Sequence, residues 1–187
     1  KWETVRKAQA ALKFVCVNAD EGDSGTFADR MLMEGDPFSL VEGMVIAAYA
    51  VGASEGFIYV RSEYPHAVAT LRRAIDIAYA HGVLGQSVLG SAHAFDLDVR
   101  VGAGAYICGE ETSMLESLEG KRGMVRFKPP LPAIEGLFGK PTVINNVETL
   151  ANLPLILHHG AEWYSALGTK GSKGTKVFAL GGKINNT

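Results

Sequence analysis

Residues 101–120, VGAGAYICGEETSMLESLEG, have side chains and a spacing that suit a nucleotide. An apolar strand leads through a glycine-rich turn into a short amphipathic helix. Gly102, Gly104 and Gly109 remove side chains where a flat or phosphorylated ligand must approach the backbone. The helix start offers free backbone N–H groups, which favour an anion. The pattern therefore predicts a nucleotide-binding turn.

Glu110 and Glu111 indicate which part of a nucleotide this turn holds. Two carboxylates at a helix start suit the positive end of the helix dipole, but they repel a phosphate. They accept hydrogen bonds from hydroxyl groups instead. We therefore predict that the turn holds a ribose or the edge of a flavin, and that the phosphates bind elsewhere.

A second polar cluster occupies residues 18–25, NADEGDSG, directly after an apolar, β-branched run at residues 12–18 that predicts a buried strand. In open α/β sheets, ligands bind where the strands end, so this cluster is a candidate binding loop. The alternative is a solvated turn in which Ser24 or Thr26 caps a helix over residues 26–33. Composition favours neither alternative.

The proline- and glycine-rich segment at residues 121–150 is a candidate for the phosphates, because long irregular segments in compact domains are often functional. A helix is expected from Asn146 onward, and Asn145 or Asn146 either helps to bind an anion or only caps that helix. His158 and His159 suit the end of that helix, so we predict no metal site there. The cations of the segment are Lys121, Arg122, Arg126, Lys128 and Lys140.

Strand and helix patterns alternate along the chain, which predicts an α/β fold with a mainly parallel sheet flanked by helices. Helices are expected over residues 37–52 and 64–82, and Pro154 is expected to kink the helix after Asn146. The predicted strands are residues 12–18, 57–61, 95–101 and 176–181, the last of which closes the sheet.

Composition narrows the class of protein. With 187 residues, of which 47% are hydrophobic and 20% charged, the chain predicts one globular domain. A net charge of -2 gives no reason to expect nucleic acid or direct membrane insertion. Cys16 and Cys108 are far apart and lack CxxC spacing, so we predict buried thiols in a cytoplasmic setting and no metal or cluster site within this chain.

Several phrases of the sequence resemble the NADH-oxidising flavoprotein subunits. They are the opening Lys1-Trp2, CVNADEGDSGTFADR at residues 16–30, GAGAYICGEETSMLESLEG at 102–120 and KPPLPAIEGLFGKPTVINNVETL at 128–150. This family includes the 51-kDa-type subunit of respiratory complex I, the diaphorase subunit of NAD-reducing hydrogenases and the beta subunit of soluble NAD-dependent formate dehydrogenase. The wording is most similar to the formate dehydrogenase subunit.

The resemblance implies a Rossmann-like domain that binds FMN and exchanges hydride with NAD(H) as substrate. The flavin carries that chemistry, so no catalytic acid or base is assigned. Glu111 would disfavour a 2′-phosphate and so select NAD over NADP. The positions that match FMN contacts are Lys1, Asn18, Asp20, Tyr106, Gly109, Glu110, Asn145, Asn146 and Thr149; those that match NADH contacts are Asp23, Glu111 and Lys128.

Three departures from the family pattern stand out. Asp23 replaces the glutamate that is common in complex I, and Thr4 and Leu131 replace phenylalanines that stack on adenine. The chain also begins at Lys1 without a methionine, and it ends in mid-phrase. We therefore expect one FMN/NADH-binding domain from a longer protein, without the upstream glycine-rich loop and the downstream ubiquitin-like and 4Fe-4S domains.

The resemblance also implies partners. They are a thioredoxin-like 2Fe-2S subunit and a larger iron–sulfur/molybdenum, hydrogenase or complex I subunit. The expected location is the bacterial cytoplasm, at the inner face of the membrane in the case of complex I. An alternative of another class is a flavin-free structural or interaction fragment.

Overall fold

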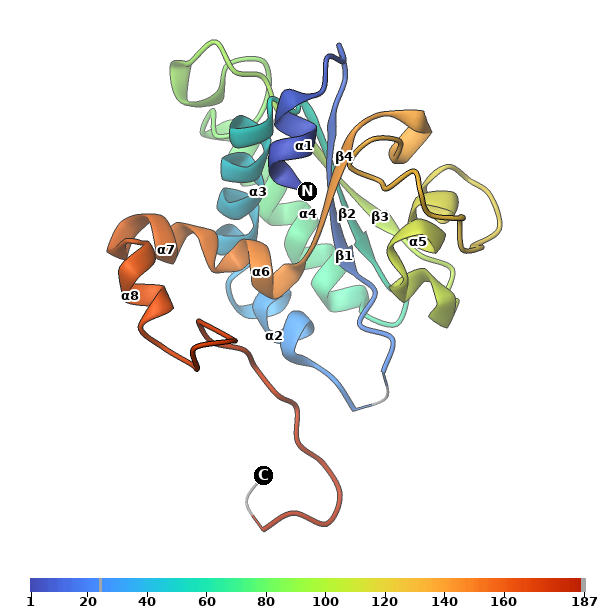
Figure 1. The fold of residues 1–187 in the computed structure, drawn as a ribbon, viewed down its shortest axis with the longest axis vertical. Coiled ribbons are helices and arrows are strands. Elements are labelled where there is room, and N and C mark those ends of the chain that lie inside the picture. The colour runs from blue at the N-terminus through green and yellow to red at the C-terminus, as the bar shows by residue number, and fades with distance from the viewer. Residues whose placement is uncertain (24, 186–187) are drawn as a thin grey trace.

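A four-stranded sheet forms the centre of the protein in this computed structural model, which describes residues 1–23 and 25–185 (Figure 1). All neighbouring strands are parallel, which confirms the predicted α/β class. The spatial order is β3-β2-β1-β4. Ser24, one of the two predicted helix caps, lies outside the described residues. The strands are β1 (Phe14–Ala19), β2 (Glu55–Val60), β3 (Asp96–Val101) and β4 (Thr142–Asn146).

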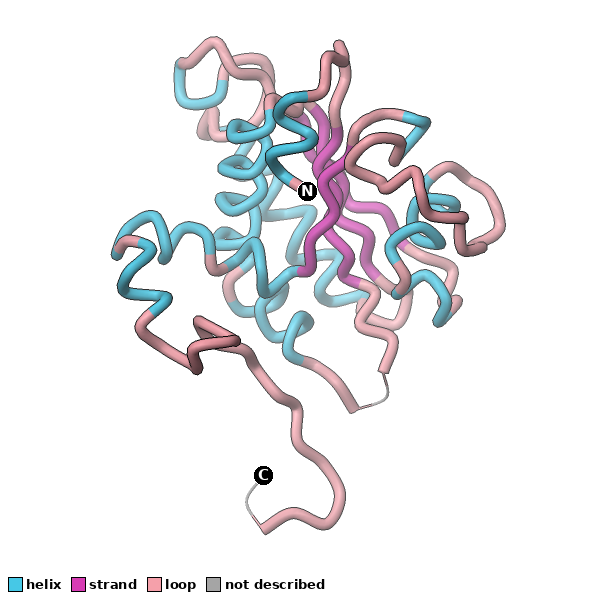
Figure 2. Tube along the Cα trace, viewed as in Figure 1, coloured by secondary structure: helices cyan, strands magenta, loops and turns pink. Residues whose placement is uncertain are grey.

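Helices and loops cover both faces of the sheet (Figure 2). Most of the helices lie on one face, while α5 and the long loops around it lie on the other (Figure 1). The helices are α1 (Trp2–Lys7), α2 (Ala28–Gly35), α3 (Pro37–Val51), α4 (Pro65–Ala80), α5 (Glu111–Leu118), α6 (Val147–Ala151), α7 (Leu153–His159) and α8 (Ala161–Ser165). Short 3-10 turns are η1 (Val88–Gly90), η2 (Tyr106–Gly109) and η3 (Leu137–Gly139).

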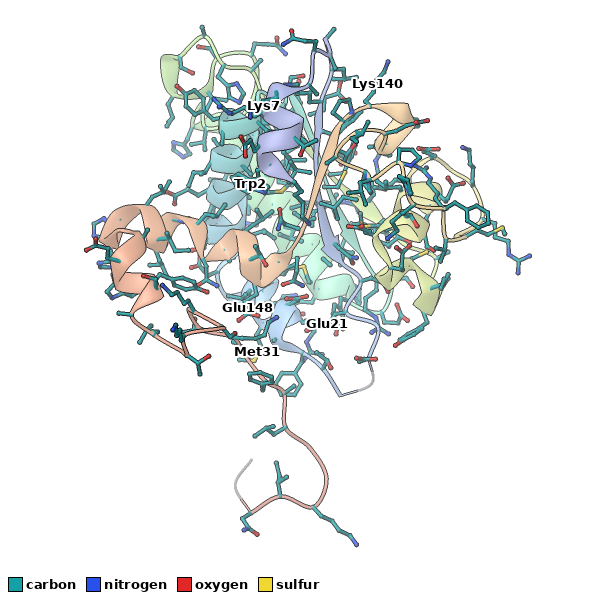
Figure 3. The ribbon with its side chains drawn as sticks, in the orientation of Figure 1. Trp2, Lys7, Glu21, Met31, Lys140 and Glu148 are labelled. Carbon is teal, nitrogen blue, oxygen red and sulfur yellow. The ribbon has the colours of Figure 1, made fainter. Side chains whose placement is uncertain are left out.

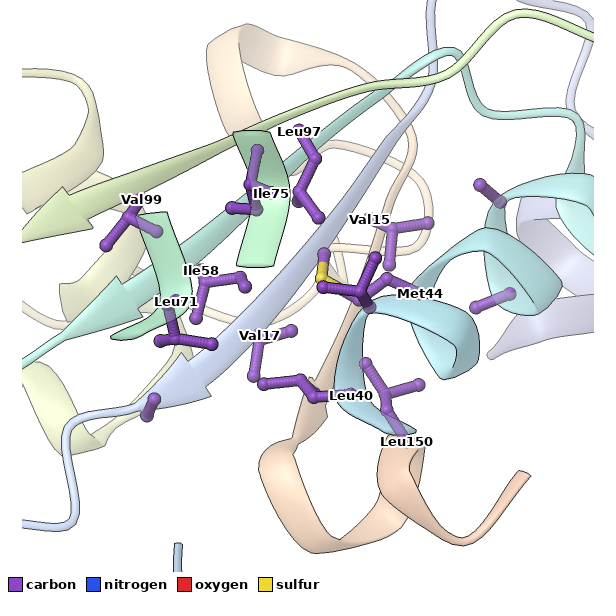
Figure 4. Packing of buried hydrophobic residues seen from close by; sticks show 14 of the residues in the cluster. Val15, Val17, Leu40, Met44, Ile58, Leu71, Ile75, Leu97, Val99 and Leu150 are labelled. Atoms are coloured by element: carbon purple, nitrogen blue, oxygen red, sulfur yellow. The ribbon is translucent and has the colours of Figure 1, made fainter. Parts of the chain in front are cut away.

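Alternate side chains of β1 enter two separate cores. Val15 and Val17 pack with residues of α3, α4 and α6 in the larger core, part of which Figure 4 shows. Phe14 and Cys16 point to the other face and join a smaller core with residues of α5. A strand covered on both faces needs apolar side chains on both, which is why this segment reads as one continuous apolar run.

The strand order reverses at β1. β2 pairs with one edge of β1 and β4 pairs with the other, in a register that places Asn18 opposite Asn146. Parallel sheets of this kind leave a crevice at the carboxyl ends of the strands, at the point where the order reverses. The fold therefore brings the polar ends of β1 and β4 to one place.

The end of the chain differs from the prediction. The predicted strand at residues 176–181 is wrong, because these residues form an irregular segment that pairs with no strand. The closing strand is β4, which lies within the segment that the sequence predicted to be irregular. The predicted single helix after Asn146 is divided into α6, α7 and α8, and Pro154 lies in the first turn of α7 instead of inside a continuous helix. At that position its missing N–H costs no hydrogen bond.

Both cysteines are free and buried, as predicted. Burial raises the pKa of the Cys16 thiol well above its usual range, so it stays protonated and packs as a small apolar side chain.

Gly43 of α3 determines how closely that helix packs against α6. An added Cβ would clash with the backbone carbonyl group of Leu150, whose carbon would lie 2.7 Å away. Because that group belongs to the backbone, it cannot move aside as a flexible side chain would. We expect G43A to lower the free energy of unfolding by about 2 kcal/mol, measured by urea unfolding. G35A, at the end of α2, is the control, because its Cβ would meet no atom within 4 Å; equal destabilisation by both variants would contradict this account.

Candidate functional site

A cleft of about 840 Å³ lies at the carboxyl ends of β1 and β4. Glu21 and Glu148, which line it, are labelled in Figure 3 at the end of the sheet where these strands finish. Five segments that are distant in sequence contribute to its walls. The predicted site residues that line it are Lys1, Asn18, Asp23, Tyr106, Gly109, Glu110, Glu111, Asn145, Asn146 and Thr149.

Two predicted residues, Asp20 and Lys128, lie just outside the cleft lining. Asp20 is only 4% exposed, behind Gly109, whose added Cβ would lie 3.5 Å from the Asp20 carboxylate. Burial raises the pKa of Asp20, and the nearby Arg61 partly opposes this shift. Lys128 reaches the cleft edge through its ammonium group, which binds the carboxylates of Glu110 at 2.9 Å and Glu111 at 3.3 Å.

Glu110 caps the amino end of α5. One carboxylate oxygen accepts the backbone N–H groups of Thr112 at 2.8 Å and Ser113 at 3.0 Å, and the other accepts from Lys128. Partial burial alone would raise the pKa of Glu110, but the hydrogen bonds from Lys128, Thr112 and Ser113 outweigh it and lower the pKa to about 2. The Glu110 side chain therefore holds the turn in place, while Glu111 has one carboxylate oxygen without a partner among the described residues.

Only one of the three glycines of the predicted turn faces the cleft. Gly109 lines it, whereas Gly102 makes room for Tyr59, whose hydroxyl oxygen would lie 2.5 Å from an added Cβ. Gly104 has a φ of +84°, which a residue with a side chain rarely adopts. Packing and turn geometry, not ligand access, thus explain Gly102 and Gly104.

Three asparagine side chains tie the ends of β1 and β4 to their surroundings. Asn18 donates to the Gly109 carbonyl at 2.8 Å, which fixes η2 beside the end of β1. Asn145 accepts the indole N–H of Trp2 at 2.9 Å, so its own amide N–H groups remain to donate. Asn146 accepts the Glu148 N–H at 2.9 Å and so caps α6, one of the two roles that the sequence predicted for it.

Tyr106 and Asp23 connect two loops at the cleft mouth. The Tyr106 hydroxyl donates to the Asp23 carboxylate at 2.9 Å, and the ring is 70% exposed. Gly22 permits this approach, because an added Cβ would lie 2.9 Å from the Tyr106 ring. A single exposed hydrogen bond is weak, so this contact can open when a ligand enters.

Of the cations predicted to bind phosphate, Lys128 reaches the cleft edge, but none lines the cleft itself. Arg126 binds the carboxylates of Glu116 at 2.5 Å and Glu119 at 2.7 Å, and Lys121 also binds Glu119. These groups line a separate cavity of about 630 Å³ beside α5. The lysines that line the cleft itself, in the described part of the chain, are Lys1 and Lys176.

Three acidic residues of the cleft had no predicted role: Glu21, Asp29 and Glu148. Glu21 accepts the backbone N–H of Asp29 at 2.8 Å and the hydroxyl of Tyr64 at 2.9 Å, so it fixes the start of α2. Asp29 is 7% exposed, and burial, with the neighbouring Glu21, raises its pKa to about 6. Glu21 lies in the predicted polar loop, but no sequence pattern distinguishes Asp29 from an ordinary helical carboxylate.

Carboxylates outnumber cations in the cleft lining, six to two. This charge favours ligand groups that donate hydrogen bonds, such as hydroxyls and amides, over groups that are negatively charged. The predicted preference of the Glu110–Glu111 turn for hydroxyl groups agrees with this electrostatic character. The carboxylates are Glu21, Asp23, Asp29, Glu110, Glu111 and Glu148; the cations are Lys1 and Lys176.

The chain matches a known protein family and a solved structure. Residues 1–155 match the Complex1_51K family, which is described as the Nuo51 FMN-binding domain. The crystal structure of NAD+-reducing NiFe-hydrogenase in the H2-reduced state has a similar fold, with a TM-score of 0.84 and 44% identity. That similarity covers 92% of this chain and 29% of that chain.

Curated relatives match almost the whole chain. The NADP-reducing hydrogenase subunit HndC of Solidesulfovibrio fructosivorans is 52% identical over all of this chain and 38% of its own length. An NADH-quinone oxidoreductase subunit of Rhizobium meliloti (strain 1021) is 50% identical over 98% of this chain and 44% of its own. The corresponding NADH-quinone oxidoreductase subunit of Escherichia coli (strain K12) is 47% identical over all of this chain and 42% of its own. The chain thus spans less than half the length of these relatives.

The raised pKa of Asp29 makes stability depend on pH. The folded state binds this proton more tightly than the unfolded chain, where an aspartate has a pKa of about 3.9, so the contribution of Asp29 to the free energy of unfolding falls as pH rises from about 4 to 6. D29N does not titrate. Relative to the native chain, the free energy of unfolding of D29N should therefore increase by about 1–2 kcal/mol as pH rises from about 4.5 to 7, as measured by urea unfolding.

E110Q is a control for which the stability difference from the native chain should change with pH in the opposite direction. The pKa of Glu110 is lowered to about 2, so the stability that this carboxylate contributes is present above its unfolded pKa. The native chain should therefore lose its advantage over E110Q as pH falls from about 5 towards 2. A D29N difference that stays constant with pH would contradict our account of Asp29.

Proposed function

Because the chain belongs to the Complex1_51K family of Nuo51 FMN-binding domains, we propose that it is the module that exchanges hydride between NAD(H) and FMN in an NADH oxidoreductase complex. FMN is its cofactor. The observation that carries the proposal is the cleft at the strand-order reversal, which is lined by ten of the residues that the family resemblance assigns to FMN and NADH.

The residues of the cleft fit the flavin ring of FMN. A cleft of about 840 Å³ is in the size range of small-molecule and cofactor sites. Gly109 presents backbone without a side chain, and Asn145 has amide N–H groups that no described residue accepts. A flavin ring needs such a flat approach and such donors for its carbonyl oxygens.

In the proposed mechanism the side chains bind and orient two ligands, and none acts as an acid or base. When bound, FMN supplies the hydride chemistry with NAD(H). Asn18 holds η2 against β1, and Lys1 supplies positive charge near the end of β4. Glu111 accepts hydrogen bonds from hydroxyl groups of the dinucleotide, while Lys128 holds its carboxylate. Distance and orientation are the contribution of the protein to the rate.

The domain can belong to one of three kinds of enzyme complex. We propose a soluble NAD-dependent formate dehydrogenase, on the support of the wording of CVNADEGDSGTF, of YVRSEYPHA and of residues 122–147. The alternatives are a hydrogenase and a respiratory complex I, favoured by the HndC and NADH-quinone oxidoreductase relatives. Copurified subunits and a comparison of formate, hydrogen and quinone as redox partners of NAD(H) distinguish the three.

Electrons must leave the flavin for other carriers. We propose that they pass to a 4Fe-4S cluster in a downstream domain of the longer protein, and to a thioredoxin-like 2Fe-2S subunit. No helix among the described residues is long and apolar enough to cross a membrane. We propose a cytoplasmic location, at the inner membrane face if the parent is complex I.

Flavin binding tests the proposal directly. The full-length protein that carries this chain, mixed with FMN, should show the absorption band of a bound oxidised flavin, and anaerobic NADH should bleach that band. A protein that stays colourless would contradict the proposed function and favour the flavin-free alternative. A bound flavin that NADH does not bleach would contradict the assignment of NADH as substrate.

Selection of NAD over NADP tests the role of Glu111. E111Q removes the carboxylate that would repel a 2′-phosphate, so the ratio of kcat/KM for NADH to that for NADPH should fall about 10-fold. E42Q, an exposed glutamate of α3 away from the cleft, is the matched control and should leave the ratio unchanged. An unchanged ratio in E111Q would remove Glu111 from the account of specificity.

A further inference from the structure

Asp29, in the lining of the cleft, joins α2 to the end of β4. Its carboxylate accepts the side-chain N–H of Asn146 at 2.7 Å, and the amide oxygen of Asn146 accepts the Glu148 backbone N–H at 2.9 Å. An asparagine held at both its oxygen and its nitrogen has one orientation. The amide nitrogen of Asn146 still has a second N–H, which no described residue accepts, and Asn146 lines the cleft.

The position of Asp29 is itself fixed. Glu21, in the loop after β1, accepts the backbone N–H groups of Asp29 at 2.8 Å and Arg30 at 3.1 Å. Tyr64, at the start of α4, donates to the same Glu21 carboxylate at 2.9 Å. A continuous set of hydrogen bonds therefore runs from the end of β1, through α2, to the end of β4.

A carboxylate at this position is costly. Asp29 is nearly buried, and the acidic groups Glu21 and Glu148 face it from the β1 loop and from α6, which raises its pKa. Stability alone would favour a neutral side chain in such surroundings. The Asp29 carboxylate offsets part of this cost by accepting the hydrogen bond from Asn146.

We propose that Asp29 is a positioning residue of the FMN site, which acts on FMN by fixing the side chain of Asn146. This inference rests on the function proposed above. With its orientation fixed, Asn146 presents its remaining N–H to an oxygen of FMN. Asn146 caps α6 through its amide oxygen, which leaves its amide nitrogen to donate to Asp29 and to a ligand.

A double-mutant cycle tests the proposal, using the dissociation constant of FMN for the flavin-stripped, full-length protein as the readout. D29L removes the acceptor and should weaken FMN binding about 10-fold, as should N146A. The double variant D29L/N146A should bind no more than about 2-fold more weakly than N146A alone, because Asp29 acts through Asn146. D29N retains an acceptor oxygen and should stay within about 3-fold of the native protein.

E34Q is the matched control, because it removes a carboxylate from the same helix outside the cleft lining and should leave FMN affinity unchanged. D29A replaces D29L if that variant does not fold. Native affinity in D29L, multiplied losses of about 100-fold in the double variant, or equal losses in D29N and D29L would each overturn the inference. A native protein that does not bind FMN would overturn the proposed function itself.

Discussion

The reversal of strand order at β1 is the constraint on which the site depends. Because β2 and β4 pair with opposite edges of β1, the carboxyl ends of β1 and β4 lie side by side, and the cleft lies at these ends. Asn18 and Asn146 face each other in the register at that edge, where polar side chains remain accessible. The two apolar cores cover the faces of the sheet, and the cleft lies at the carboxyl ends of β1 and β4.

That cleft collects negative charge, and the fold compensates each carboxylate locally. Glu110 binds the start of α5 and Lys128, Glu21 binds the start of α2 and Tyr64, and Asp29 binds Asn146. Carboxylates that accept backbone N–H groups at helix starts cost little, because those N–H groups need partners. An acid-lined cleft can therefore exist at this edge without unpaired buried charge, and it selects ligands rich in hydroxyl and amide donors.

The sequence predicted what depends on local patterns. Apolar runs indicated β1 and β2, an alternating pattern indicated β3, and the glycine-rich turn indicated the start of α5. β4 was missed because its five residues end in two asparagines and lie between proline- and glycine-rich segments, although Val143 and Ile144 are β-branched. Without β4 the strand-order reversal could not be predicted. Arg126 was assigned to phosphate because its partners Glu116 and Glu119 become neighbours only through the tertiary fold.

Glu110 and Glu111 illustrate where family resemblance and physical reasoning differ. Resemblance assigns both residues to ligands, and their side chains are chemically identical. The structure makes Glu110 the N-cap of α5, with its carboxylate occupied by backbone N–H groups and Lys128. Glu111 is the first residue of the helix, and one of its carboxylate oxygens has no partner in the described part of the chain. One step along the chain therefore separates a side chain that holds the turn from a side chain that can meet a ligand. A contact with FMN at position 110 is accordingly one that the backbone can make, while the free carboxylate at position 111 is the group that can distinguish a ribose hydroxyl from a phosphate.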